Sequence, residues 1–472
     1  MRRHSIGLLL VTGAAVALAV LFVGAGYPSP IYDGWGYYRL AALLRERGLA
    51  GWPTGIRTYG YPFFALVVTG FRPIGPEAFR LALFVAQLVL YLAVCAFAAR
   101  RLARIFGSPA LGVAAYALGA LNPALLLQAT EPLTDLLSAA LILAAVALTW
   151  RCPEGRPPGA PAALSLPSFL CAGFAVAVRS PNVAAVAGLA AAWALRTWRW
   201  KEAKRRLLVA AAVGLLAPLV PQAIARHAQT GAYLPLVEPG LYRDQAAWGM
   251  RVLKYGTLVV DGRPPFLLTA NPLDRGAATP GEFAAHHPLA YAGTLFLHGF
   301  ALLDRDLPFT YVTDVDPWYR VPITFANLLL VGLALTGLGA AAMRLARRPA
   351  RTRESPAIGA LDERAFVSVS TALVAAAYLA VYLPVAVESR FGAPLQALAP
   401  VLAVAGLASL TGPSATRTRR AALAMAALAA CGGLALSSWI ARHRSNPPDL
   451  RALSAPDFRP PESPASAAPP AR

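Results

Sequence analysis

Apolar runs of about 20 residues recur along the chain, which is the length that an α-helix needs to cross the hydrocarbon core of a bilayer. The first run extends from about Ile6 to Gly24 and is longer than the roughly 7–15 apolar residues of a signal peptide, so we interpret it as a membrane span. Further spans are predicted at 78–99, 109–128, 132–150, 206–225, 321–343, 366–387, 391–410 and 421–440.

The apolar run 166–196 is too long for a single span and is interrupted by the sequence RSPN at Arg179–Asn182. The basic sequences on both sides of the run indicate that its two ends lie on the same, inner side of the membrane. The run is therefore predicted to form two short segments that meet at Arg179, near the outer side. Together the runs predict an all-α, polytopic membrane protein with about 11 transmembrane helices.

Charge gives the chain an orientation. Arg2 and Arg3 precede the first run, and most other basic clusters follow spans that return to the same side, as expected of inner loops. Charged residues make up only 14% of the sequence, against about 25% in an average soluble domain. The net charge of +20 is explained by the inner loops, and no basic–aromatic repeat or binding motif points to nucleic acid as a partner.

The same pattern divides the chain into four parts. We expect an N-terminal transmembrane module at 1–225, which includes a first outer loop at 26–77. A large outer loop at 226–320 follows, then C-terminal transmembrane helices at 321–441 and a proline-rich, disordered tail at 442–472.

The first outer loop contradicts the charge rule, because it carries five arginines outside: Arg39, Arg45, Arg47, Arg57 and Arg72. After Asp33, the apolar residues Leu40, Ala41 and Leu44 recur at helical spacing. This predicts an amphipathic helix at the membrane surface, ended by Gly48, with a second surface or shallow segment at 58–71. Asp33 could be a helix N-cap, but the outer arginines point to a functional site.

Several motifs follow one another along the chain. The first outer loop contains Asp33 followed by YY, A, L and G, and then R-x-YGYPFFAL from Arg57. Later segments read NPALLLQATEPLTDLL from Asn122, AGFAVAVRSPN from Ala172 and ESRFGAPLQALAP from Glu388. In this order they resemble the GT-C glycosyltransferases, membrane enzymes that transfer a sugar from a polyprenyl-phosphate carrier. Relatives include the protein O-mannosyltransferases and the aminoarabinose transferase that acts on lipid A.

The resemblance implies roles for individual residues. Asp33 would be the catalytic base of an inverting transfer, although Gly34 stands where some relatives have a second acidic residue. Arg179 and Arg390, with Arg57, would hold the carrier phosphate, for which paired guanidinium donors are well suited. Each arginine could instead be an interfacial anchor, a partner of a nearby carboxylate or a solvated loop charge.

Glu131 and Asp135 are four residues apart and would share one face of a helix start. They could bind a divalent cation or orient the acceptor, or they could be a helix-start pair favoured by the helix dipole. We group Tyr37 and Tyr61 with them as candidate acceptor-orienting residues. No other cofactor is expected, and the metal requirement stays open.

These observations predict a hexosyl or pentosyl transferase in the bacterial inner membrane, with its site facing the periplasm. Its partners would be a polyprenyl-phosphate sugar donor, a glycan, lipid or protein acceptor of the cell envelope, and membrane lipids. A secondary transporter or flippase is one alternative, but it should carry its ionisable residues near the bilayer middle and show repeated halves. An O-antigen polymerase or ligase is another, although an acidic loop directly after the first helix is not expected there.

Overall fold

The described part of the protein, taken from a computed structural model, is built from helices. It comprises residues 2–24, 30, 32–52, 57–150, 161–197, 201–233, 236–237, 239–250, 279–304, 317–346, 363–385, 387–409 and 416–442. The predicted tail at 442–472 lies outside the described residues except for its first position.

The helices follow the chain in the order predicted from the apolar runs. Their bounds are α1 Arg2–Gly24, α2 Tyr32–Arg47, η1 Leu49–Gly51, α3 Gly60–Val68, α4 Pro76–Phe106, α5 Pro109–Ala120, α6 Pro123–Ala129, α7 Thr134–Thr149, α8 Pro161–Val178, η2 Ser180–Asn182, α9 Val183–Thr197, α10 Lys201–Thr230, α11 Pro239–Trp248, α12 Pro280–His286, α13 Pro288–Ala301, α14 Pro317–Ala346, α15 Glu363–Tyr382, η5 Ser389–Gly392, α16 Ala393–Ser409 and α17 Thr416–Arg442.

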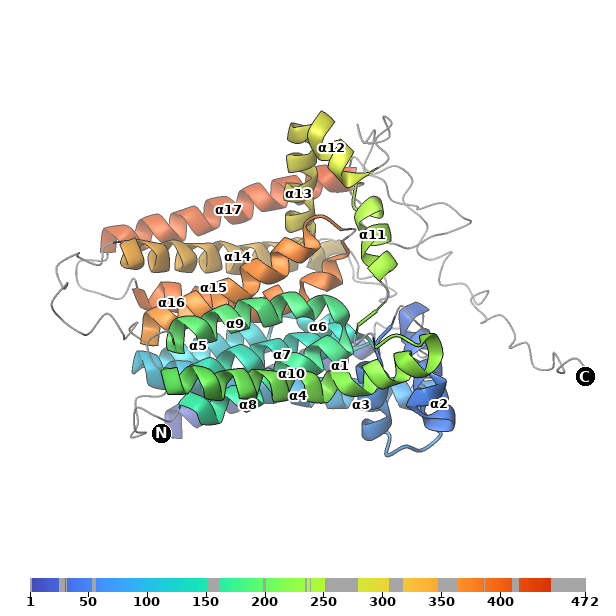
Figure 1. Cartoon of the computed structure of the whole chain (residues 1–472). Coiled ribbons are helices and arrows are strands. Elements are labelled where there is room, and N and C mark those ends of the chain that lie inside the picture. Colours follow the sequence, from blue (N-terminus) through green and yellow to red (C-terminus); the bar gives the residue numbers. More distant parts are fainter. Residues whose placement is uncertain are drawn as a thin grey trace, which may run out of the picture.

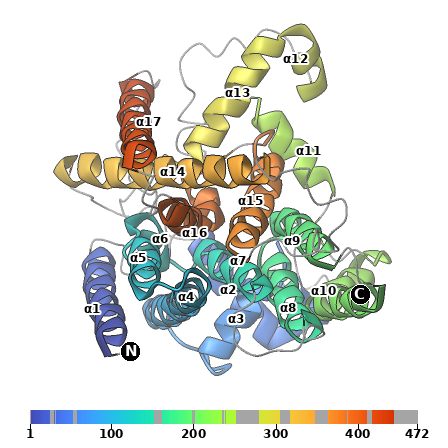
Figure 2. The same ribbon diagram turned by 90° about the vertical axis from the view of Figure 1, so that its left-hand side faces the viewer.

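The long helices form one bundle, and α2, α3 and α11 to α13 lie at the end of it that is opposite the N-terminus (Figure 1). Seen along the bundle, α7 is surrounded by other helices (Figure 2), and 13 of its 16 residues are buried. α7 therefore lies at the centre of the core.

Within the described residues, six helices are long and apolar enough to cross a membrane. The pair α5 and α6, bent by 51°, would make a seventh, and three shorter apolar helices accompany them. The all-helical, polytopic membrane architecture is thus confirmed, while the count of about 11 crossings stays a prediction. The predicted break in the run 166–196 is also found, since α8 ends at Val178 and α9 begins at Val183.

Small residues allow the helices to approach closely, as is common in membrane proteins. A Cβ atom added to Gly173 of α8 would lie 2.6 Å from the carbonyl oxygen of Gly214 in α10. That oxygen lacks its usual helical donor, because Pro218 has no N–H four residues later. Gly337 of α14 meets Gly406 of α16 in a similar way, with 2.6 Å between the added Cβ of Gly406 and the Cα of Gly337.

The segment predicted to be the first outer loop is attached to the bundle. Leu40, Ala41 and Leu44 of α2 are buried, as the helical spacing predicts, and a glycine with φ 64°, Gly48, ends the helix. This apolar face packs on protein side chains that include Trp52, and the expected position at the membrane surface stays a prediction. The loop therefore supports a site of fixed geometry at the end of the bundle.

Candidate active site

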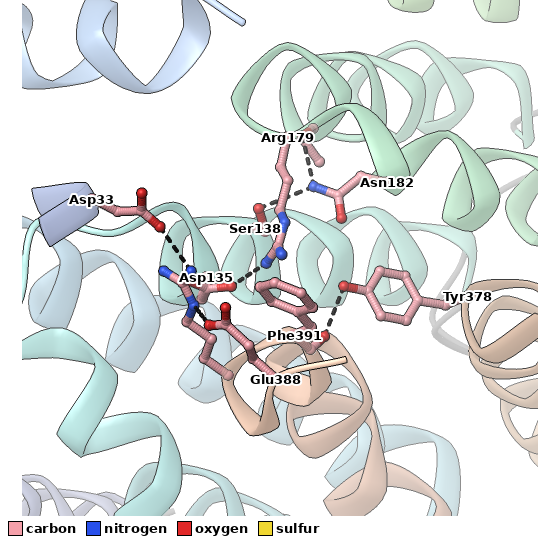
Figure 3. A network of polar contacts seen from close by, with 10 residues as sticks. Asp33, Asp135, Ser138, Arg179, Asn182, Tyr378, Glu388 and Phe391 are labelled. Atoms are coloured by element: carbon pink, nitrogen blue, oxygen red, sulfur yellow. Dashed lines mark hydrogen bonds and ion pairs between the residues drawn. The ribbon is translucent and has the colours of Figure 1, made fainter. Parts of the chain in front are cut away.

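Asp33 lies in the first turn of α2, outside the long apolar helices, and its side chain is 33% exposed. Its Oδ1 accepts a hydrogen bond from Arg57 Nη2 at 2.5 Å, and its Oδ2 accepts one from Arg390 Nη2 at 2.7 Å. Both carboxylate oxygens are therefore bound by guanidinium groups from distant parts of the chain. The structure brings these three predicted site residues together. Figure 3 shows Asp33 with one of these two contacts, beside Asp135 and Glu388.

Two glycines explain how close the neighbours of Asp33 come. A Cβ atom on Gly36 would lie 2.8 Å from Arg57 Nη1, and one on Gly34 would lie 3.1 Å from the ring of Pro132. The sequence D-G-x-G at Asp33–Gly36 could have indicated that other groups come close to Asp33. Which groups these are can be seen only in the folded structure.

Arg390 belongs to η5, between α15 and α16, and its Nε donates a hydrogen bond to Glu388. The ring of Phe391 lies near two cations, with its centroid 5.2 Å from the guanidinium carbon of Arg390 and 4.0 Å from that of Arg179. The hydroxyl of Tyr378 donates to the Phe391 carbonyl at 2.9 Å (Figure 3). This aromatic ring joins the two predicted phosphate-binding arginines into one site.

Arg179 stands at the break between α8 and α9, with extended backbone angles of φ −155° and ψ 115°. Its Nη1 donates to Asp135 Oδ1. The break is held against α7 by Asn182, whose Nδ2 donates to Ser138 Oγ at 3.0 Å and to the Ala175 carbonyl at 2.7 Å (Figure 3). Asn182 and Ser138 are supporting residues that the sequence motifs did not single out.

Glu131 and Asp135 do not share a helical face, because α7 begins only at Thr134. The Glu131 side chain has no exposed surface, and its Oε1 accepts from Arg80 Nε at 3.0 Å. Gln87 Nε2 lies 3.4 Å from the Glu131 carbonyl oxygen. Arg80 was missed by the sequence reasoning, because it lies inside an otherwise apolar span.

Tyr37 and Tyr61 line the side of the site near Arg57. The guanidinium carbon of Arg57 lies 4.7 Å from the Tyr37 ring centroid, and the two tyrosine rings meet edge to face at 4.9 Å. Burial raises the pKa of the Tyr37 hydroxyl, so this group stays protonated and can donate a hydrogen bond.

The charges of the site are balanced by pairing. Burial by itself would raise the pKa of Asp33, but Arg390 and Arg57 outweigh that effect and hold the pKa well below its usual value. Asp135, Glu131 and Glu388 each bond an arginine as well. No cluster of three or more candidate metal ligands occurs in the described part of the chain, and the possible divalent cation stays a prediction.

Among solved structures, the chain is similar to an oligosaccharyltransferase of Archaeoglobus fulgidus in the apo form, with 15% identity and a TM-score of 0.48. That match covers 97% of this chain but 58% of the other, so the chain spans little more than half the length of the oligosaccharyltransferase. It is also similar to ArnT from Cupriavidus metallidurans bound to undecaprenyl phosphate, with 17% identity, 86% and 78% coverage and a TM-score of 0.39. No protein-family model and no curated protein matches the chain.

Proposed function

We propose that the chain is an integral membrane glycosyltransferase that moves a hexosyl or pentosyl group from a polyprenyl-phosphate-linked donor to an acceptor of the cell envelope. The observation that carries the proposal is the Asp33 carboxylate held between Arg57 and Arg390 at the end of the bundle. A carboxylate can take a proton from an acceptor hydroxyl, and guanidinium groups can bind the phosphate of the leaving lipid. The proposed setting is the bacterial inner membrane with the site facing the periplasm.

In the proposed reaction, the acceptor hydroxyl oxygen attacks the anomeric carbon of the sugar. The bond from that carbon to the phosphate oxygen breaks, and its electron pair stays on the phosphate as polyprenyl phosphate leaves. Asp33 takes the hydroxyl proton, and a single displacement inverts the anomeric configuration. Arg57, Arg179 and Arg390 would stabilise the charge on the leaving phosphate.

The low pKa of Asp33 makes it a weak base while both arginines hold it. A phosphate that binds Arg390 and Arg57 would offset their positive charge and so weaken their effect on the pKa of Asp33. Since burial then acts with less opposition, the pKa of Asp33 would rise. In this proposal the base becomes effective only after the donor has bound.

The proposed roles of the remaining residues follow from their exposure. Tyr37 would donate to the acceptor or to the donor sugar from beside Arg57. Tyr61, Glu131 and Asp135 are buried, so we propose that they act on the substrates indirectly, by holding Tyr37, Arg80 and Arg179 in place.

The test is transfer of labelled sugar from polyprenyl-phosphate donors to envelope glycolipids by the purified full-length protein and its Asp33→Asn variant. We expect turnover by the wild type and its loss in the variant, with both proteins folded at the assay temperature. Equal turnover by both proteins would remove Asp33 as the base. A wild type that hydrolyses or transfers no donor would refute glycosyl transfer.

A further inference from the structure

The segment that carries Glu388 and Arg390 connects α15 to α16, and we call residues 383–385 and 387–392 the Arg390 segment. Its first residue is held by the outer-loop helix α13. His298 has no exposed surface, and its Nδ1 lies 2.7 Å from the carbonyl oxygen of Leu383. Because a carbonyl oxygen only accepts, Nδ1 carries the hydrogen of this bond.

The same helix also meets the other end of the Arg390 segment. Leu302, directly after α13, is buried, and a Cβ atom on Gly392 would lie 1.8 Å from its carbonyl oxygen. Position 392 therefore admits only glycine while the two backbones are this close. The end of α13 and the residue that follows it thus contact the segment on both sides of Arg390.

A second outer-loop helix contacts the segment near its start. A Cβ atom on Gly249, which follows α11, would lie 2.5 Å from the carbonyl carbon of Val385 and 2.6 Å from the Pro384 oxygen. Two elements of the outer loop therefore fix the backbone that leads to Arg390.

We infer that His298 is a positioning residue for the transfer reaction, because its bond to Leu383 helps to aim Arg390 at Asp33 and at the donor phosphate. The inference rests on the proposed function. Arg390 reaches Asp33 at 2.7 Å, and a displacement of about 1 Å in a catalytic group can cost on the order of 10²-fold in rate. The outer loop thus contributes to phosphate binding by positioning Arg390, in addition to any role in selecting the acceptor.

The test compares His298→Asn, His298→Gln and His298→Ala in the full-length protein in detergent. The amide nitrogen of Asn can take the place of Nδ1, whereas that of Gln corresponds to the other ring nitrogen. We measure hydrogen–deuterium exchange of the Arg390 segment, where Phe391 N donates to the Glu388 carbonyl at 2.9 Å, together with kcat and KM. Thr294→Val is the matched control, because Thr294 is buried on the same helix and bonds its own backbone at Ala290.

We expect faster exchange of the segment in His298→Ala and His298→Gln, with kcat lowered by on the order of 10²-fold. His298→Asn and the control should keep both quantities within a few-fold of the wild type. Unchanged exchange in His298→Ala overturns the inference, and so does faster exchange with full turnover. A wild type without any turnover refutes the proposed function instead, while the exchange data still decide whether His298 holds the segment.

A second pair of variants covers the case in which His298→Ala does not fold. Gly249→Ala would push against Val385 from the side of α11, whereas Gly240→Ala, in α11 itself, has open space around the added Cβ. We expect faster exchange of the Arg390 segment and a lower kcat in Gly249→Ala alone. Equal behaviour of the two variants overturns the claim that the outer loop fixes this segment.

Discussion

Asp33→Asn should have two opposite effects: loss of sugar transfer and tighter binding of the lipid carrier. Asp33 is the shared counter-ion of Arg57 and Arg390, so a phosphate that binds these arginines must compete with its carboxylate. Asparagine has nearly the same shape but no negative charge. Both guanidinium groups then become fully available to the phosphate, while no base remains at this position.

The magnitude follows from the pairing geometry. Two unit charges about 4 Å apart attract by about 1 kcal/mol in bulk water and about 4 kcal/mol at the effective dielectric constant of a protein surface. The side chains of Asp33 and Arg390 are 33% and 11% exposed, so solvent screens the pairs in part. With about 1–2 kcal/mol of competition removed, undecaprenyl phosphate should bind roughly 5–30-fold more tightly.

The assay is direct titration of undecaprenyl phosphate into detergent-solubilised wild type and variant at fixed ionic strength, beside the transfer assay. Asp244→Asn is the matched control, because it makes the same charge change at an exposed Asp–Arg pair on α11. Unchanged or weaker binding in Asp33→Asn would refute the competition between Asp33 and phosphate. Full transfer would show that Asp33 is not the base and only pairs with the two arginines.

Four further outcomes are expected. Gly36→Ala places a Cβ 2.8 Å from Arg57 Nη1, so it should weaken undecaprenyl phosphate binding by about fivefold, or about 1 kcal/mol, in the same titration. Glu131→Gln leaves the buried charge of Arg80 beside a neutral amide, so it should lower the free energy of unfolding by about 3–5 kcal/mol. The double variant Glu131→Leu/Arg80→Met removes both charges, so thermal unfolding should show a smaller loss of stability for it. The native pKa of Asp33 is depressed, so its contribution to stability is present above the unfolded value of about 3.9 and is lost as pH falls toward the native one. The difference in unfolding temperature between wild type and Asp33→Asn should therefore be larger at pH 6 than at pH 3.5, and the reverse trend would contradict the pairing. Finally, EDTA should leave turnover unchanged, because the carboxylates of the site are bonded to arginines.

The fold and part of the site could be predicted because hydropathy and charge act locally. The apolar runs give the helices, and RSPN gives the break at Arg179, since a proline and a polar triplet cannot continue an apolar helix there. The meeting of Asp33, Arg57 and Arg390 was expected only because their loops were assigned to one side of the membrane.

Other features depend on contacts that no local pattern records. Glu131 was placed on a helix, yet Leu133 has an extended backbone with φ −117° and ψ 157°, so α7 starts after it. Arg80 is an isolated charge in an apolar span, and its partner lies 51 residues away. The reason for Gly392 lies in the carbonyl of Leu302, which only the folded structure brings to it.

The pairing of Asp33 with Arg390 has a consequence for how the protein is made, because the two residues are 357 positions apart. At about 5–20 residues per second, a ribosome needs roughly 20–70 seconds to reach the second residue after the first. During that interval the half-made chain already contains Arg57, only 24 positions after Asp33. Arg57 can therefore neutralise Asp33 early in synthesis, and a nascent chain acquires its complete site only when its last helices have been inserted.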